Sequence, residues 1–115
     1  MILVPIRTVS ALNAREHHMA RSRRVKAERK VTALMLRISR HPKPTLPCTV
    51  LLTRIAPSAG IDPFDNLPSS LKGCADQIAQ WLGVDDRHDD RVRYECRQKR
   101  GPWGVSIEFL PYNAS

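Results

Sequence analysis

The chain has 115 residues, of which 42% are hydrophobic and 26% are charged, and its formal net charge at pH 7 is +8. This length suits one ordinary domain over residues 1–115 and excludes a second large core. No run approaches the roughly 20 apolar residues that a membrane helix needs, and no signal peptide is recognisable. Three cysteines without a Cys-x-x-Cys pair argue against a zinc site or a disulfide framework. We therefore expect a cytoplasmic protein with no membrane segment.

The charge is unevenly distributed along the chain. Residues 1–43 hold 11 Lys and Arg against 2 Asp and Glu (net +9), residues 44–90 hold 3 against 7 (net −4), and residues 91–115 hold 5 against 2 (net +3). A basic surface around an acidic centre suits a protein that holds phosphates and also binds a cation. Many basic proteins never touch nucleic acid, so the charge alone favours nucleic-acid binding only slightly.

The first part of the chain predicts one strand and one long helix. Apolar and β-branched residues from Ile2 to Val9 are typical of an edge strand that tolerates a proline. No glycine or proline interrupts the stretch from Ala14 to about Ile38, so we expect a helix there that ends before the prolines of residues 41–44. Its second half presents apolar residues at near-helical spacing, namely Val25, Val31, Leu34, Met35 and Ile38.

The middle of the chain predicts a buried strand followed by a second helix. The β-rich stretch from Cys48 to Ile55 should be a central strand of the sheet. Asp65 or Asn66 can start the helix that follows, because both residue types are favoured at helix N-termini. Gly83 is predicted to end this helix, since glycine readily adopts the left-handed conformation found there.

The last part of the chain predicts two strands joined by a turn. Apolar and charged residues alternate from Arg91 to Lys99, which is the pattern of a strand with one basic face. Gly101-Pro102 forms a turn, and Trp103 to Leu110 is read as the returning strand of a hairpin. The element order β-α-β-α-β-β predicts an α/β (or α+β) fold, a single small domain with a mixed sheet of about four strands and helices packed on it.

Carboxylates gather between Asp62 and Asp86, around the second predicted helix. At 3.6 residues per turn, Asp65, Lys72 and Asp76 share one polar stripe of that helix, and the pair Asp85-Asp86 could fold back toward it. Carboxylates repel one another, whereas Mg²⁺ takes oxygen ligands and keeps waters that a substrate phosphate can displace. The pattern therefore predicts a Mg²⁺ site for phosphodiester hydrolysis, in which Lys72 offsets charge in the transition state.

The same residues also have a purely structural interpretation. Acidic residues near a helix start stabilise the helix dipole, and Lys72 and Asp76 form an ordinary i,i+4 pair. The acidic stretch of residues 85–90 suits a solvated loop. Spacing alone favours this structural interpretation over the metal site.

The run DNLPSSLKGCADQIAQWLGVDD, residues 65–86, resembles the signature of the RusA family of Holliday junction resolvases. In that family an Asp-Asn pair leads into a helix, a Lys and then an Asp follow, and the helix ends just before an acidic pair. The stretch NAREHHMARSRRVKAERK, residues 13–30, is similar to the entry of phage-encoded relatives. The usual family pattern has two aspartates separated by one residue, whereas Asp62 and Asp65 are separated by two.

The resemblance implies a homodimer that binds four-way DNA junctions by their structure and nicks two strands symmetrically, using Mg²⁺ or Mn²⁺. The implied metal-binding and catalytic carboxylates are Asp65, Asp76 and Asp86, with Asp62 and Asp85 as second choices for the metal. Lys72 is the implied catalytic cation. The candidates for phosphate contacts, which position DNA without reading bases, are Arg15, Arg21, Arg23, Arg24, Lys26, Arg93, Arg97 and Lys99.

Two other interpretations stay open. The chain could be a non-catalytic nucleic-acid-binding accessory protein of a phage or prophage, in which the carboxylates are structural. It could also be a small interaction protein whose acidic centre pairs with another basic surface. Cleavage assays with point variants separate the first from a nuclease, and the salt dependence of nucleic-acid binding separates the second.

Overall fold

A computed structural model of the chain describes residues 1–9, 18–58, 60–85 and 90–112. Its elements are β1 (Ile2–Val4), α1 (His18–Ile38), β2 (Cys48–Ala56), α2 (Asn66–Leu82), β3 (Val92–Arg100) and β4 (Gly104–Pro111). The predicted element order and the α+β class with a mixed four-stranded sheet are confirmed. β1 is shorter than predicted, and the predicted start of the long helix lies outside the described residues.

The sheet has the order β1-β4-β2-β3. β4 runs antiparallel to both β1 and β2, whereas β2 and β3 are parallel and paired from Cys48↔Val92 to Ala56↔Arg100. β2 is central, as predicted, because its apolar residues are buried when strands pair with it on both sides. This parallel pair brings the carboxyl ends of β2 and β3 to one edge of the sheet.

The predicted hairpin between the last two strands is wrong, since β2 lies between β3 and β4. The connection crosses the end of β2, where the Gly101 N–H donates a hydrogen bond of 2.9 Å to the Ala56 carbonyl. A Cβ atom on Gly101 would lie 2.9 Å from Cγ2 of Ile55, so this close crossing requires a residue without a side chain. The predicted turn at Gly101-Pro102 is present, and it joins β3 to β4. The two strands do not pair because the apolar strand β2 lies between them.

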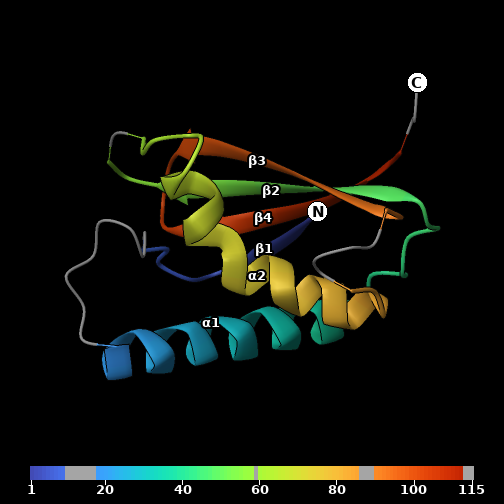
Figure 1. The fold of residues 1–115 in the computed structure, drawn as a ribbon, viewed down its shortest axis with the longest axis horizontal. Coiled ribbons are helices and arrows are strands. Elements are labelled where there is room, and N and C mark those ends of the chain that lie inside the picture. Colours follow the sequence, from blue (N-terminus) through green and yellow to red (C-terminus); the bar gives the residue numbers. More distant parts are fainter. Residues whose placement is uncertain (10–17, 59, 86–89, 113–115) are drawn as a thin grey trace.

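Both helices lie on one face of the sheet, and no described helix covers the opposite face (Figure 1). The core forms where α2 packs under the sheet, and it includes the fully buried side chains Leu52, Leu71, Ile78 and Ile107. α1 lies alongside α2 and reaches the shorter strand β1. The site described below therefore lies on the helical side of the sheet.

The face that α1 buries differs from the predicted apolar stripe. Leu34 and Ile38 are 43% and 57% exposed, whereas Glu28, Thr32 and Leu36 are buried. The charge of Glu28 is tolerated because Arg24 Nη1 lies 3.0 Å from its Oε1. The predicted stripe is wrong in these positions because a paired carboxylate and a hydrogen-bonded threonine replace apolar side chains at the contact with α2.

The end of α2 is where the sequence placed it. Gly83 has a φ of +77°, and its N–H donates to the carbonyl of Gln80, which closes the last turn. Neither described helix is long and apolar enough to cross a membrane. All three cysteines are free thiols, with Cys48 and Cys74 buried and Cys96 half-buried.

Candidate functional site

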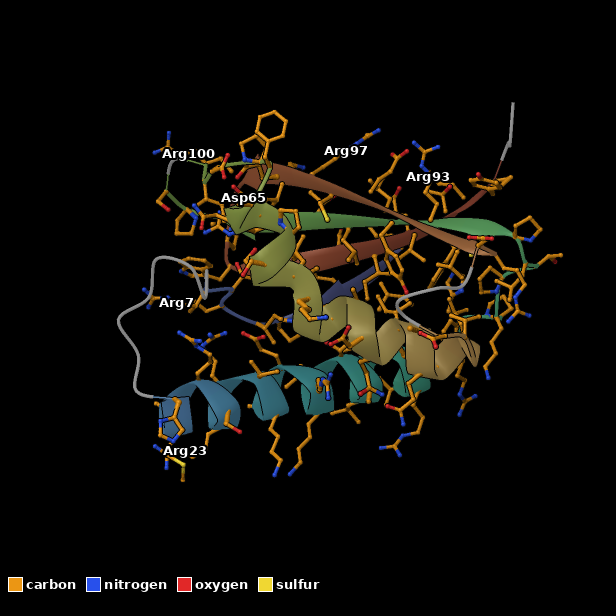
Figure 2. All side chains as sticks on the ribbon, viewed as in Figure 1. Arg7, Arg23, Asp65, Arg93, Arg97 and Arg100 are labelled. Carbon is orange, nitrogen blue, oxygen red and sulfur yellow. The ribbon has the colours of Figure 1, made fainter. Side chains whose placement is uncertain are left out.

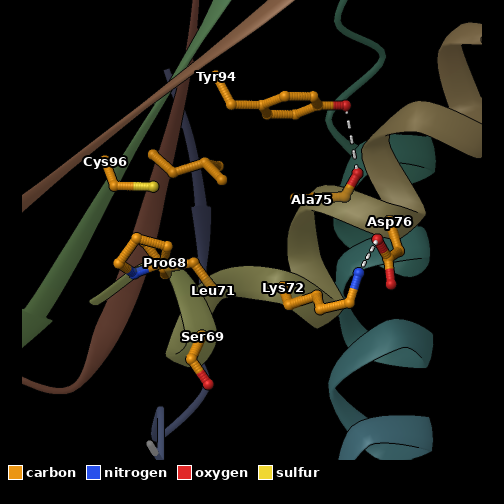
Figure 3. Close-up of a pocket in the computed structure, with 9 residues that line it drawn as sticks. Pro68, Ser69, Leu71, Lys72, Ala75, Asp76, Tyr94 and Cys96 are labelled. Atoms are coloured by element: carbon orange, nitrogen blue, oxygen red, sulfur yellow. Dashed lines mark hydrogen bonds and ion pairs between the residues drawn. The ribbon is translucent and has the colours of Figure 1, made fainter. Parts of the chain in front are cut away.

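The candidate site is centred on Asp76, on the side of α2 that meets α1. Its Oδ2 accepts a hydrogen bond of 2.8 Å from Nη2 of Arg29, and its Oδ1 accepts one of 3.3 Å from Nζ of Lys72 (Figure 3). The side chain of Asp76 is 14% exposed, whereas that of Lys72 is 68% exposed. Two exposed cations therefore share one shielded carboxylate, since the side chain of Arg29 is also 47% exposed.

The packing of the two helices explains why Arg29 reaches Asp76. α1 approaches α2 closely at Gly73, where a Cβ atom would lie 3.2 Å from Oε2 of Glu28. One residue further on, Sγ of Cys74 lies 3.4 Å from the Thr32 hydroxyl, and burial raises the pKa of the Cys74 thiol to about 11. Small and buried side chains at this contact hold α1 near α2, so Arg29 lies within reach of a carboxylate 47 positions away in the sequence.

Asp76 borders two depressions on the surface. The first, which we call the helix groove, has a volume of about 320 Å³ and lies between α1 and α2. Its basic lining residues are Arg21, Arg24, Arg29 and Lys72. The second, which we call the α2-end hollow, has a volume of about 350 Å³ and is lined by Arg29, Asp76, Gln80 and Asp85 among others. A groove with four basic lining residues and a hollow with two carboxylates thus meet at Asp76.

A third depression, of about 340 Å³, lies between α2 and β3 (Figure 3). Its walls are mostly apolar, from Leu52, Pro68, Leu71 and Ala75, and Lys72 and Asp76 lie at its border. The hydroxyl of Tyr94 donates a hydrogen bond of 3.4 Å to the Ala75 carbonyl. The depression separates the site from β3 and adds few polar groups to it.

The carboxylates at the start of α2 have a different role. Oδ1 and Oδ2 of Asp62 accept hydrogen bonds from the backbone N–H groups of Phe64 and Asp65, at 3.3 and 3.0 Å. These bonds, first of all that from Asp65, hold the pKa of Asp62 below its usual range. Asp65 is the N-cap residue of α2, but its side chain makes no capping hydrogen bond. Asp62 therefore shapes the turn that leads into the helix.

The structure does not bring the predicted metal ligands together in the residues it describes. Asp65 and Asp76 share a helix face, yet eleven residues at 1.5 Å each place them about 16 Å apart along the axis, too far for one ion. No group of three acidic, histidine or cysteine side chains that could hold a metal ion occurs within residues 1–9, 18–58, 60–85 and 90–112. Asp76 and Asp85 line one hollow, and Asp86 lies outside the described residues.

The predicted phosphate contacts divide between two opposite sides of the molecule. Arg21 and Arg24 are half-buried in the helix groove, whereas Arg23 and Lys26 are exposed on α1. Figure 2 shows Arg23 pointing away from the sheet on the α1 side, while Arg93 and Arg97 point away on the other side of the sheet. Lys99 is exposed on β3 as well, and Arg15 lies outside the described residues.

Sequence reasoning missed two arginines that the fold makes important. Arg29 lies in the basic stretch that was considered for DNA contact, but nothing local pairs it with Asp76. Arg54 lies in the predicted central strand and is only 5% exposed. The only sequence feature that could have singled it out is its charge within an otherwise apolar run.

No family model, curated protein or solved structure matches the chain. The RusA resemblance therefore stays a prediction drawn from the residues themselves.

Proposed function

We propose that the protein is a Mg²⁺-dependent endonuclease (Mn²⁺ being the alternative ion) that binds and nicks branched DNA such as Holliday junctions. The observation that carries the proposal is the meeting of the helix groove and the α2-end hollow at Asp76. The groove is lined by four cations against the carboxylates of Glu28 and Asp76, which leaves an excess of positive charge for a phosphate backbone, and the hollow offers two carboxylates beside it. The resemblance of residues 65–86 to the RusA signature supports the same function.

In this proposal Asp76 and Asp85, which both line the α2-end hollow, would hold the Mg²⁺ ion, because this ion is often bound by one or two carboxylates together with substrate oxygens. When bound, the metal would polarise the phosphodiester and lower the pKa of an attacking water. Asp86 follows directly in the sequence and is the next candidate ligand, as the resemblance implies. The proposed centre thus lies at the end of α2, and Asp62 and Asp65 lie away from it.

The cations around Asp76 have separate tasks in this proposal. Arg29, at 2.8 Å, fixes the orientation of the Asp76 carboxylate from the neighbouring helix. Lys72 is mostly exposed and its contact with Asp76 is longer, at 3.3 Å, so it can turn to a phosphate at little cost. There it would offset the negative charge that develops in the transition state. The cations of the helix groove would hold the flanking phosphates.

The proposal also includes the surfaces that contact DNA, the oligomeric state and the cellular location. Basic residues lie on two opposite sides of the molecule, and a branched substrate with arms in several directions can contact more than one side. A homodimer would supply one nicking centre for each of two strands, as the resemblance implies. The cytoplasm, where DNA junctions and free thiols are both found, is the expected location.

The test is cleavage of a labelled four-way junction with Mg²⁺, Mn²⁺ or EDTA, with linear duplex as a second substrate. We expect metal-dependent paired nicks on the junction and none on the duplex. Asp76→Asn should lower the rate at least about 100-fold while junction affinity changes little. The matched control is Glu108→Gln, which also turns a carboxylate into an amide but lies on the strand β4. Equal cleavage by Asp76→Asn and Glu108→Gln would refute the assignment of the site.

A second candidate function is non-catalytic binding of branched nucleic acid. Both oxygens of Asp76 already accept hydrogen bonds from cations, so this carboxylate has a structural role that requires no metal. Tight, salt-sensitive junction binding without cleavage under any metal would favour this function over the nuclease. Weak binding to every nucleic acid at moderate salt would exclude both functions.

A further inference from the structure

Arg54 is a buried arginine on the central strand β2. It is 5% exposed, and its Nε donates a hydrogen bond of 2.9 Å to the Thr8 hydroxyl. Its guanidinium carbon lies 5.5 Å from the ring centre of Trp103, which Arg7 approaches to 5.0 Å from elsewhere on the ring. No carboxylate within the described ranges forms an ion pair with Arg54. The remaining N–H groups of this guanidinium are therefore available to a ligand.

Most donors of the Arg54 guanidinium have no hydrogen-bond acceptor among the described residues. A guanidinium carries five N–H donors, and one neutral hydroxyl satisfies one of them. The contact with Trp103 contributes on the order of 1 kcal/mol and accepts no conventional hydrogen bond. Burial lowers the pKa of Arg54, in the direction expected for a cation without a nearby negative charge. The fold thus retains a charge that its described residues do not neutralise.

Arg54 lines a small pocket at the carboxyl ends of the parallel strands β2 and β3. The pocket, which we call the Arg54 pocket, has a volume of about 160 Å³ and is lined by Arg54, Ser58, Gly60, Gln98, Lys99 and Arg100. Ligands of sheets with parallel strands commonly bind beyond these ends. Drug-sized molecules need pockets of about 300 Å³ or more, so this one suits a single small group.

The walls of the pocket are fixed by hydrogen bonds on two sides. The Gln98 amide accepts from the Ile61 N–H at 2.9 Å and donates to the Ile61 carbonyl at 2.8 Å, which ties the loop to β3. Nε of Arg100 donates to the Pro57 carbonyl at 3.2 Å, which ties the end of β3 to the segment that follows β2. Two arginines and a serine hydroxyl therefore surround a preformed space, and a preformed space reduces the cost of ligand binding.

We propose that the Arg54 pocket binds one phosphoryl group, supplied either by a nucleic-acid backbone or by a free phosphoanion. Planar guanidinium groups match the geometry of phosphate oxygens and bind them through paired, charge-assisted hydrogen bonds. The exposed Ser58 hydroxyl adds a neutral donor at the rim. This inference concerns binding at the sheet end, away from the α2-end hollow, and it does not rest on the proposed nuclease activity.

The test is titration of the protein with inorganic phosphate by calorimetry at constant ionic strength, with chloride as the reference anion. We expect saturable binding by the unchanged protein. Arg54→Gln should weaken it at least about tenfold, because the paired hydrogen bonds are lost. Ser58→Asp, at an exposed position outside the helices and strands, should weaken it similarly by placing a carboxylate at the rim. The matched control is Arg37→Gln, which removes one positive charge from an exposed position of α1 outside the pocket and should retain binding within about twofold.

Two results would overturn the inference. One is the absence of phosphate binding beyond the effect of chloride. The other is equal binding by Ser58→Asp and Arg37→Gln, which would mean that net charge alone attracts the anion. A competition assay then separates the sources of the phosphoryl group. If phosphate displaces a short DNA duplex from the unchanged protein but not from Ser58→Asp, the pocket takes a backbone phosphate, and if phosphate binds without changing DNA affinity, it takes a free phosphoanion.

Discussion

The contact between α1 and α2 predicts a loss of stability at alkaline pH that depends on Cys74. Burial raises the pKa of this thiol to about 11 from its ordinary value of 9.0. The unfolded chain therefore loses the Cys74 proton from about pH 9 upward, while the folded protein retains it. The stabilisation is fully present below pH 9 and is lost as the pH rises toward 11. At 1.36 kcal/mol per pH unit, the loss amounts to about 2.7 kcal/mol, a large share of a typical stability of about 5–15 kcal/mol.

The assay is urea unfolding at intervals between pH 7.5 and 10.5, for the protein and for Cys74→Ala. At pH 7.5 the variant should be less stable by about 1–2 kcal/mol, because removal of the buried sulfur leaves a small void. Lysines and tyrosines titrate alike in both proteins, so the difference between the two stability curves isolates Cys74. We expect that difference to shrink steadily above pH 9 and to reach zero between about pH 9.7 and 10.5, the higher value applying to the larger starting difference.

A difference that stays constant with pH would refute this reasoning. It would mean that the Cys74 thiol ionises as easily in the folded protein as in the unfolded chain. The close packing of Cys74 against Thr32 would then be wrong, and with it the contact that places Arg29 beside Asp76.

Three further predictions test the fold by its stability. Ile78→Ala should lower the free energy of unfolding by about 3–4 kcal/mol in urea, because this fully buried side chain would leave a cavity. Gly83→Ala should lower it by about 1 kcal/mol, since a φ of +77° strains any residue with a Cβ atom, and Gly83→Asn should cost less. Gly101→Ala should lower the melting temperature through its clash with Ile55, and a double-mutant cycle with Ile55→Ala should recover part of that loss, whereas additive effects would contradict the crossing of β2.

The fold was predictable where local patterns decide it. The apolar run from Cys48 to Ile55 indicated a central strand, and Gly83 indicated the end of α2. The pairing of β3 was not predictable, because the turn at Gly101-Pro102 suits a hairpin as well as a crossing over another strand. The choice between a hairpin and a crossing depends on which strand buries the most apolar surface when it has a neighbour on both sides. Here that strand is β2, which lies far from β3 and β4 in the sequence.

The candidate site was predictable only along α2. Helical spacing places Lys72 and Asp76 together, and the structure confirms that pair at 3.3 Å. The same spacing places Asp65 on their face, but the rise of 1.5 Å per residue separates it from Asp76 by about 16 Å along the axis, too far for one ion. Arg29 joins the pair through the packing of α1 on α2, which depends on the small residue Gly73 and cannot be read from either helix alone.

Net charge is a poor guide to where this protein binds anions, because the fold decides which cations already have a carboxylate. Arg29 is paired with Asp76, so its charge is largely compensated within the protein. Arg54 has no carboxylate partner in the described part of the chain, although it is far more buried and contributes the same charge to the net +8. An uncompensated buried cation attracts an anion more strongly than an exposed or paired one, because little water screens it. Anion affinity should therefore respond to Arg54→Gln much more than to substitution of a surface arginine such as Arg37.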